Sequence, residues 1–336
     1  MQLTYREARD GQILEEGITE AGSMASMTAA GTAYATHDVS MAPFFIFYSM
    51  FGFQRVGDLI WSFADQRGRG FLLGATAGRT TLTGEGLQHA DGHSPHLAAA
   101  WPNCRVYDPA FAYELAVIIR DGWKRMFVEG DDVFYYLTLY NENYEMPAMP
   151  EGVEDDLLKG LYRWQGAPSG PSKRATILFS GTGWKAAAQA QAELADHYDV
   201  GAELWSATSW KGLRDEALAV ERANRIRPSQ PQRTPWVTAK LSETEGPYVA
   251  VTDYITNVPD SIARWVPGTF VPLGTDGFGR SDTREALRRH FEVDAGHVVV
   301  AVLTALAQEQ QVKEEIVADA IRRYGIDPDA ADPRTA

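Results

Sequence analysis

The segment GEGLQHADGHS, residues 84–94, places two histidines four positions apart among glycines and acids. On a helix this spacing would bring the imidazoles of His89 and His93 onto one face, as in zinc sites. The glycines argue against a helix, and no distant ligand completes a metal set. Two interpretations remain: a loop that carries His89 into a pocket, since glycine permits close approach of backbone to ligand, or a solvated surface loop.

A carboxylate stands at the entrance to a segment of small and apolar residues. Glu20 precedes AGSMASM, which has the composition of a buried helix. A carboxylate in such a place needs a partner or a proton. Desolvation raises the pKa of a buried carboxyl, which suits it to exchange a proton with a ligand. Glu20 is therefore a candidate for proton transfer.

Aromatic side chains follow the first apolar run. In YSMFGFQR, Tyr48, Phe51 and Phe53 stand just after a predicted strand, at the end where α/β folds bind ligands. They could belong to the core, or they could form the wall against which a flat heterocycle stacks.

A second glycine-rich turn, SGTGWKAAAQ from Ser180, opens a predicted helix in the second half of the chain. Glycines there would let backbone N–H groups face an anion at the helix start. The dinucleotide fingerprint has a third glycine where Ala186 stands, and no convincing acidic residue follows the next strand. Capping of the helix by Ser180 or Thr182 explains the stretch as well.

These residues are positioned by an alternation of strands and helices. Short apolar runs bounded by Gly, Pro, Asp or Asn predict strands. In the first half these runs cover residues 43–49, 70–76, 104–110 and 132–140. Helices are predicted over 13–37, 53–67 and 112–127. Apolar runs separated by helices indicate a parallel sheet covered on both faces.

The composition changes between Asn141 and Ser172, where Pro, Gly and acids accumulate. We interpret residues 151–172 as a linker. It would join one α/β domain over 1–150 to another over 173–336. Further strands are predicted over 174–182, 200–209, 247–254 and 269–277.

Charge and composition exclude several classes of function. A formal net charge of −14, with basic residues scattered among acids, argues against a nucleic-acid surface. No apolar run reaches the roughly 18 residues of a membrane span. The single cysteine, Cys104, excludes a disulfide within the chain and is expected to be a buried, inert thiol. With no signal-peptide core at the N-terminus, a cytoplasmic location is expected.

Four segments together resemble one family: EEGITEAGS, PFFIFYSMFGFQRVGDLIW, GRTTLTGEGLQHADGHS and LGTDGFGRSDTREALRRHFEVDA. In the same order and over nearly the whole chain, they are similar to the homodimeric pyruvate dehydrogenase of bacteria. This enzyme is the thiamine diphosphate-dependent decarboxylating component of the pyruvate dehydrogenase complex. The resemblance implies two doubly wound α/β domains, a pyrimidine-binding fold followed by a transketolase C-terminal-like fold.

The resemblance also implies roles for single residues. Glu20 matches the glutamate that hydrogen-bonds N1′ of the aminopyrimidine and so favours the tautomer that activates the cofactor. Tyr48 and Phe51 match aromatic residues around the pyrimidine, and Phe51 would stack on it. His89 matches the histidine of the substrate pocket, which would move protons or hold the carboxylate of pyruvate. The role of His93 is left open.

The reaction implied is oxidative decarboxylation of pyruvate, with transfer of the acetyl unit to lipoyl groups of the dihydrolipoyl acetyltransferase. The family's diphosphate-binding domain, which holds Mg²⁺ through a Gly-Asp-Gly motif and a later Asn, has no match here. The sequence EGDD at Glu129 lacks both the glycine frame and the Asn. The resemblance therefore implies a C-terminal segment without metal ligands, with Mg²⁺ bound on the missing domain and no activity in isolation.

Two other functions remain as alternatives. One is a catalytically silent remnant that acts only in assembly, as a scaffold. The other is a transketolase-like enzyme acting on sugar phosphates. That activity would require basic residues for the phosphate, which residues 84–94 do not supply.

Overall fold

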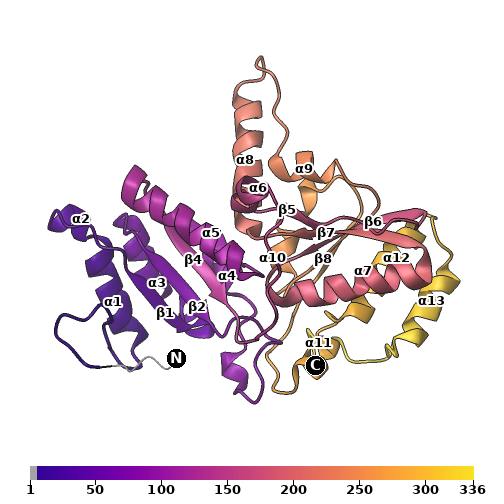
Figure 1. The fold of residues 1–336 in the computed structure, drawn as a ribbon, viewed down its shortest axis with the longest axis horizontal. Helices are drawn as coiled ribbons and strands as arrows, with labels where there is room; N and C mark the ends of the chain where they lie inside the picture. Colours follow the sequence, from indigo (N-terminus) through magenta and orange to yellow (C-terminus); the bar gives the residue numbers. More distant parts are fainter. Residues whose placement is uncertain (1–5) are drawn as a thin grey trace.

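The apolar runs of the first half form a four-stranded sheet in the order β1-β2-β4-β3, in which the paired strands are parallel. The computed structural model describes residues 6–336 of the chain. The strands of this sheet are β1 (Phe44–Tyr48), β2 (Phe71–Ala75), β3 (Cys104–Tyr107) and β4 (Phe134–Leu139). All four lie within the predicted ranges. This sheet and its helices are called the first lobe (Figure 1).

Helices cover both faces of the first sheet, as the apolar composition of its strands requires. On one face, α1 (Glu20–Gly31) and α3 (Phe53–Asp65) bury Met24, Ile60 and Phe63 against it. The other face is covered by α5 (Ala112–Trp123), which continues into the π-helical turn η3 (Lys124–Glu129). The smaller elements of the lobe are α2 (Ala33–Thr36), η1 (Ser49–Phe51), η2 (Leu87–His89) and α4 (Ser94–Ala98).

The first helix begins seven residues later than predicted. Gly17 has a φ of +70°, which ends any helix running through it. Thr19 then caps α1, because its hydroxyl accepts a hydrogen bond from the N–H of Gly22. Glu20 is consequently the first residue of α1 and not the middle of a longer helix.

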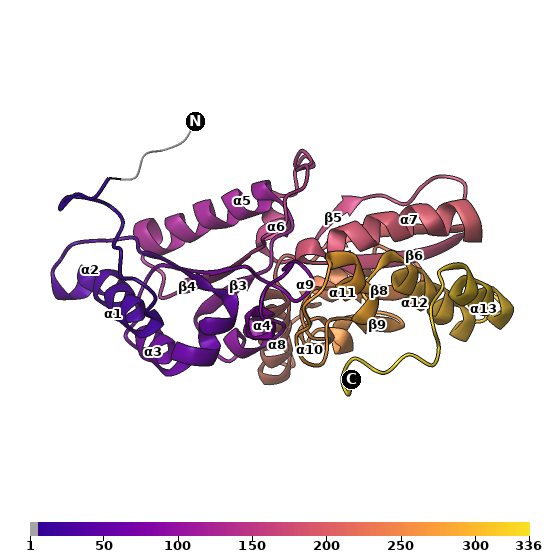
Figure 2. The ribbon, with the colours of Figure 1, turned by 90° about the horizontal axis from the view of Figure 1, so that it is seen from below.

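The second half of the chain forms a five-stranded sheet in the order β5-β7-β6-β8-β9, in which β5 alone is antiparallel to its neighbour. Its strands are β5 (Tyr162–Gln165), β6 (Lys173–Phe179), β7 (Val200–Ser206), β8 (Tyr248–Val251) and β9 (Phe270–Leu273). This sheet and its helices are called the second lobe, which lies beside the first (Figure 2).

The second sheet is also covered on both faces. One face packs against α7 (Trp184–Tyr198) and α12 (Ala295–Gln308). The opposite face packs against α8 (Trp210–Ile226), α9 (Trp236–Leu241) and the region of α10 (Asn257–Asp260). The remaining elements are η4 (Gly181–Gly183), η5 (Ala263–Trp265), α11 (Arg284–His290) and α13 (Glu314–Arg323). The α/β class and the two doubly wound sheets thus agree with the sequence-based expectation.

Residues 151–172 differ from the linker that their composition predicted. They contain helix α6 (Glu154–Leu158) and strand β5, which pairs with β7. Three side chains of the segment are fully buried and pack in the cores of both lobes: Leu157, Leu161 and Tyr162. The prediction was based on the Pro and Gly content of the segment. Composition does not show that three of its apolar side chains are buried. The proposed domain boundaries themselves stay predictions.

One stretch, Arg284–Gln308, is long and apolar enough to cross a membrane by length and composition. It is divided into α11 and α12, and most of its apolar part is buried inside the fold. A core helix of the second lobe accounts for it.

The two lobes meet through the carboxyl ends of their strands. After β3, the N–H of Asp108 donates to the carbonyl of Thr208, which follows β7 (2.8 Å). After β2, the N–H of Thr80 donates to Asp253, which follows β8 (3.1 Å). This junction brings the loops after both sheets together, which is where α/β folds build their sites.

Candidate active site

Three aromatic rings meet beyond the carboxyl end of β1. Tyr48 is the last residue of the strand, Phe51 lies in the turn η1, and His89 lies in η2. The His89 ring stacks on Tyr48 with centroids 5.0 Å apart and meets Phe51 edge-on at 5.6 Å. Residues separated by about forty positions in the chain therefore form one wall.

Glu20 is linked to this wall through an arginine. One guanidinium nitrogen of Arg55 lies 3.1 Å from each carboxylate oxygen of Glu20. The same guanidinium lies over the Phe51 ring, 4.1 Å from its centroid. The four residues expected to form a site, Glu20, Tyr48, Phe51 and His89, are thus brought together, and Arg55 is a member that the sequence did not reveal.

The side chain of Glu20 is largely buried and has a charged partner, which is one of the two outcomes that the sequence allowed. It is 15% exposed, and Arg55 is the partner. Because α1 begins at Glu20, the residue stands at the end of the helix and not inside it. Its exchange of a proton with a ligand stays a prediction.

The loop of residues 84–94 is neither a helix nor a freely solvated segment. Only three of its residues, Leu87–His89, form a short 3₁₀ turn, and α4 begins at Ser94. His93 immediately precedes α4, and burial lowers the pKa of its imidazole. Nowhere in residues 6–336 do three or more His, Cys, Asp or Glu side chains gather as a metal site requires. The loop brings the His89 ring against Tyr48 and Phe51, and the interpretation that it carries His89 into a pocket stays a prediction.

Asp91 joins this loop to the turn that carries Phe51. Its side chain is fully buried. The donors to its carboxylate are the hydroxyl of Ser49, the amide of Gln54 (3.2 Å) and the N–H groups of His93 and Ser94 (3.0 Å each). An aspartate shortly before a helix start is a capping pattern, which was a usable signal in the sequence.

Glu85 is a further acid that the sequence reasoning passed over. Its carboxylate lies 3.3 Å from Nδ1 of His89. That nitrogen is buried, and no aligned hydrogen bond joins it to Glu85 or to another described residue. The Glu85 carboxylate therefore stands beside a ring nitrogen that the described chain covers.

Phe53 belongs to the core and not to the wall. It is buried and packs edge-on against Trp101 and Tyr136, with centroids 4.9 and 5.0 Å away. Cys104 is also buried, as expected, and burial raises the pKa of its thiol to about 12. A thiol in this state is inert.

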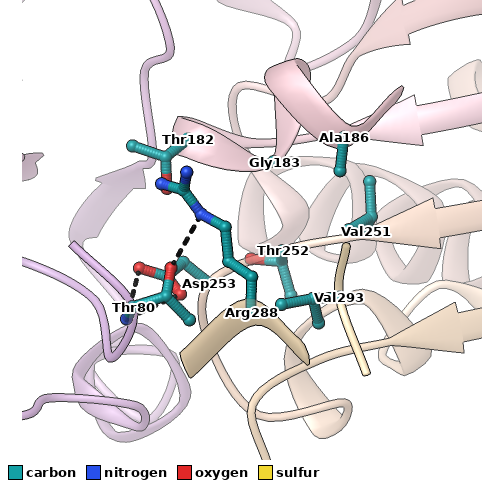
Figure 3. A pocket seen from close by; sticks show the side chains of 9 residues that line it. All are labelled: Thr80, Thr182, Gly183, Ala186, Val251, Thr252, Asp253, Arg288 and Val293. Carbon is teal, nitrogen blue, oxygen red and sulfur yellow. Dashed lines mark hydrogen bonds between the residues drawn. The ribbon is translucent and has the colours of Figure 1, made fainter. Parts of the chain in front are cut away.

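The second glycine-rich turn lies at the junction between the lobes and has no room for a phosphate. The cavity beside Thr182 and Gly183 has a volume of about 10 Å³, the space of one water molecule (Figure 3). Ser180 donates to the buried Asp108 (2.6 Å) and does not cap α7 in the described chain. A Cβ on Gly183 would lie 2.7 Å from the carbonyl oxygen of Val251. Neither the phosphate loop nor the cap was correct, since Ser180 binds the first lobe and Gly183 lets its turn approach β8 within the second lobe.

Two family models match the chain. Residues 1–147 match the pyruvate dehydrogenase E1 component middle domain, and residues 160–294 match the transketolase-like C-terminal domain. Among curated relatives, the chain is 54% identical to the pyruvate dehydrogenase E1 component of Mycolicibacterium smegmatis, over 97% of this chain and 35% of that protein. It is 52% identical to the same component of Pseudomonas aeruginosa, over 98% and 38%. With that of Escherichia coli K12 it shares 48% identity over 99% and 37%.

The chain therefore spans little more than a third of the length of these relatives. Among solved structures, transketolase from Leishmania mexicana has a TM-score of 0.59 at 16% identity, covering 80% of this chain and 34% of that one. A split-gene transketolase, an inactive β4 tetramer, has the same TM-score and identity and covers 87% and 83%. At this identity the structures show the fold alone.

Proposed function

The chain belongs to the pyruvate dehydrogenase E1 component family, and on this premise we propose that it is the part of such an enzyme that binds the pyrimidine of thiamine diphosphate. The whole enzyme would decarboxylate pyruvate oxidatively and transfer the acetyl unit to lipoyl groups of the dihydrolipoyl acetyltransferase. The observation that supports this most is that Phe51 and His89 share one wall and that Arg55 links Glu20 to it.

The residues of the wall fit an aminopyrimidine. The Arg55 guanidinium is planar, carries N–H donors and reaches the Phe51 face and the Glu20 carboxylate at the same time. A flat ring with a nitrogen at its edge requires the same two partners, so it could take the place that this guanidinium holds. The His89 ring meets the Phe51 ring edge-on in the same wall.

Each residue then has a defined task. When bound, thiamine diphosphate supplies the carbon nucleophile and the electron sink that decarboxylation needs. Glu20 would exchange a proton with the ring nitrogen, and Phe51 would fix the ring plane, with Tyr48 beside it. His89 would hold the carboxylate of pyruvate or move a proton at the keto oxygen.

We place the Mg²⁺ ligands and the diphosphate site outside this chain, on the part of the enzyme that these 336 residues do not span. By itself the chain should then be inactive. A cytoplasmic location stays a prediction from the sequence.

We also propose that the chain forms a homodimer through the first lobe. On the edge strand β1, the side chains of Phe44, Ile46 and Tyr48 are exposed in alternation, and no described helix covers them. A contiguous apolar row at a sheet edge is a common association surface. It lies next to the candidate wall, because Tyr48 belongs to both.

Reconstitution tests the activity. The chain is mixed with a companion polypeptide carrying the remaining portion of the Mycolicibacterium smegmatis relative, and CO₂ release from pyruvate is measured with thiamine diphosphate and Mg²⁺. Glu20→Ala should lower turnover far more than tenfold, or about 1.4 kcal/mol of barrier. Glu314→Ala serves as the control, since Glu314 is also the first residue of a helix but is exposed.

The outcomes separate the alternatives. Turnover of Glu20→Ala within tenfold of the parent would show that the assigned role is wrong. No CO₂ release from any mixture would leave the silent scaffold. Turnover of a sugar phosphate in place of pyruvate would favour the transketolase-like enzyme.

A further inference from the structure

The turn that carries His89 is packed from behind by the second lobe. Its front faces Tyr48 and Phe51 of the first lobe. Its back lies against the segment that follows β9 in the second lobe, which contributes no side chain to the aromatic wall. Gly279, in this segment, lies next to the Leu87–His89 turn.

Gly279 has no room for a side chain beside this turn. A Cβ placed on this residue would lie 2.6 Å from Cβ of Ala90 and 2.8 Å from the carbonyl oxygen of Leu87. Both atoms are stiff, one being backbone and the other fixed to it. Leu87–His89 is the 3₁₀ turn itself, and Ala90 is its cap. Any side chain at position 279 must therefore displace the turn or be displaced by it.

A hydrogen bond and a packed side chain join the end of the loop to the second lobe. The N–H of Ile255 in the second lobe donates to the carbonyl of Gly92 (2.8 Å). The buried guanidinium of Arg79 lies where a Cβ of Gly92 would stand and donates to the carbonyl of Thr275. Arg79 thus fills the space between the end of the loop and the second lobe.

We infer that the second lobe positions His89 for the reaction, with Gly279 as a positioning residue that sets how far the Leu87–His89 turn stands from Tyr48 and Phe51. The catalytic meaning of this position rests on the proposed function. The geometry itself does not, because it concerns contacts within this chain. The second lobe then has a task at the site although none of its side chains joins the wall.

Magnetic resonance of the histidine rings tests this inference in the chain itself. The Hε1–Cε1 signal of His89, assigned by its loss in His89→Gln, should be displaced by the rings of Tyr48 and Phe51. In Gly279→Ala it should move toward the position of an exposed histidine such as His37. The signal of His297, which is held by Asp294 elsewhere in the second lobe, should stay in place.

Gly166→Ala is the matched control. Gly166 also lies in the second lobe, but a Cβ there meets no described atom within 4 Å. Its His89 signal should match that of the parent chain. A His89 signal that is unmoved in folded Gly279→Ala, or that moves as far in Gly166→Ala, overturns the inference.

Arg79→Lys is the second variant, for the case that Gly279→Ala does not fold. Lysine keeps the charge but loses the planar guanidinium that packs against Gly92 and donates to Thr275. The His89 signal should move in the same direction, and an unmoved signal would contradict the inference. If instead His89→Gln retained full turnover in the reconstituted enzyme, the proposed catalytic role of His89 would be wrong. The effect of Gly279 on the position of the His89 ring would still hold.

Discussion

At the scale of single residues, the contacts of the candidate site differ widely in what they contribute to stability. The ion pair of Glu20 and Arg55 is half open to water, with Arg55 51% exposed, so it contributes at most about 1 kcal/mol. Asp91 is fully buried and accepts four hydrogen bonds. The exposed pair is therefore free to rearrange for a ligand, while Asp91 keeps the loop and the turn in register.

Asp91→Ala tests this difference. It leaves the backbone N–H groups of His93 and Ser94 without an acceptor, and each buried unsatisfied group costs about 1–3 kcal/mol. The Gln54 amide keeps the Ser94 hydroxyl as a partner, and the Ser49 hydroxyl keeps that of Tyr136. We therefore expect the free energy of unfolding in urea to fall by at least about 2 kcal/mol. Asp58→Ala, an exposed aspartate on α3, should stay within about 0.5 kcal/mol. A loss below about 1 kcal/mol for Asp91→Ala would contradict the assignment.

At the scale of elements, the junction between the two sheet edges contains buried carboxyls. Asp253, after β8, accepts from the N–H of Thr80 with both oxygens (3.1 and 3.2 Å; Figure 3). Burial raises the pKa of Asp253 to about 7, and the nearby charge of Asp108 acts in the same direction. The hydrogen bonds from Thr80 and the charge of Arg288 act in the opposite direction but do not cancel the effect of burial. Gly78 must be glycine beside it, because its φ is +83° and a Cβ would collide with the carboxyl.

The pH dependence of stability follows from this carboxyl. The folded chain keeps the Asp253 proton up to about pH 7, whereas the unfolded chain releases it near 3.8. Between these values the folded state binds more protons, so this group makes the free energy of unfolding fall as pH rises. The side chain of Asp253→Asn cannot ionise. From pH 4 to 7 the free energy of unfolding of this variant should therefore fall less steeply than that of the parent chain. Above pH 7 the two plots of unfolding free energy against pH should be parallel.

Urea unfolding at a series of pH values measures this. Asp260→Asn, an exposed aspartate on α10, is the control and should follow the parent chain. Equal slopes for the parent and Asp253→Asn between pH 4 and 7 would mean that the folded chain does not retain the proton.

At the scale of the whole molecule, β1 is the edge strand of the first sheet, and its row of Phe44, Ile46 and Tyr48 is exposed. The proposed homodimer would cover it. Ile46→Lys places a charge in the middle of the row, where the side chain is 63% exposed, and should turn dimer into monomer in sedimentation velocity. Ile226→Lys, 50% exposed at the end of α8, should leave the dimer intact. A dimer that survives Ile46→Lys would use another surface.

The positions of the strands in both sheets were predictable from sequence, because apolar runs between Gly, Pro, Asp and Asn are a local signal. The site residues came from the resemblance, and their types are chemically sufficient to suggest a role. Strand β5 was not predicted, because its run is short and its partner β7 lies beyond β6 and α7 in the sequence. Arg55 gave no signal either, since an arginine on an amphipathic helix is ordinarily solvated.

The amino-acid sequence by itself determined two α/β halves, their strands and a set of candidate side chains, because these depend on local periodicity and residue type. Only the tertiary structure decided that Glu20 is paired with Arg55, that the glycines after β6 serve packing and that the second lobe supports the His89 turn from behind. These facts depend on distances between residues up to 190 positions apart, such as Ala90 and Gly279. Such distances follow from how the lobes dock, which no local pattern encodes.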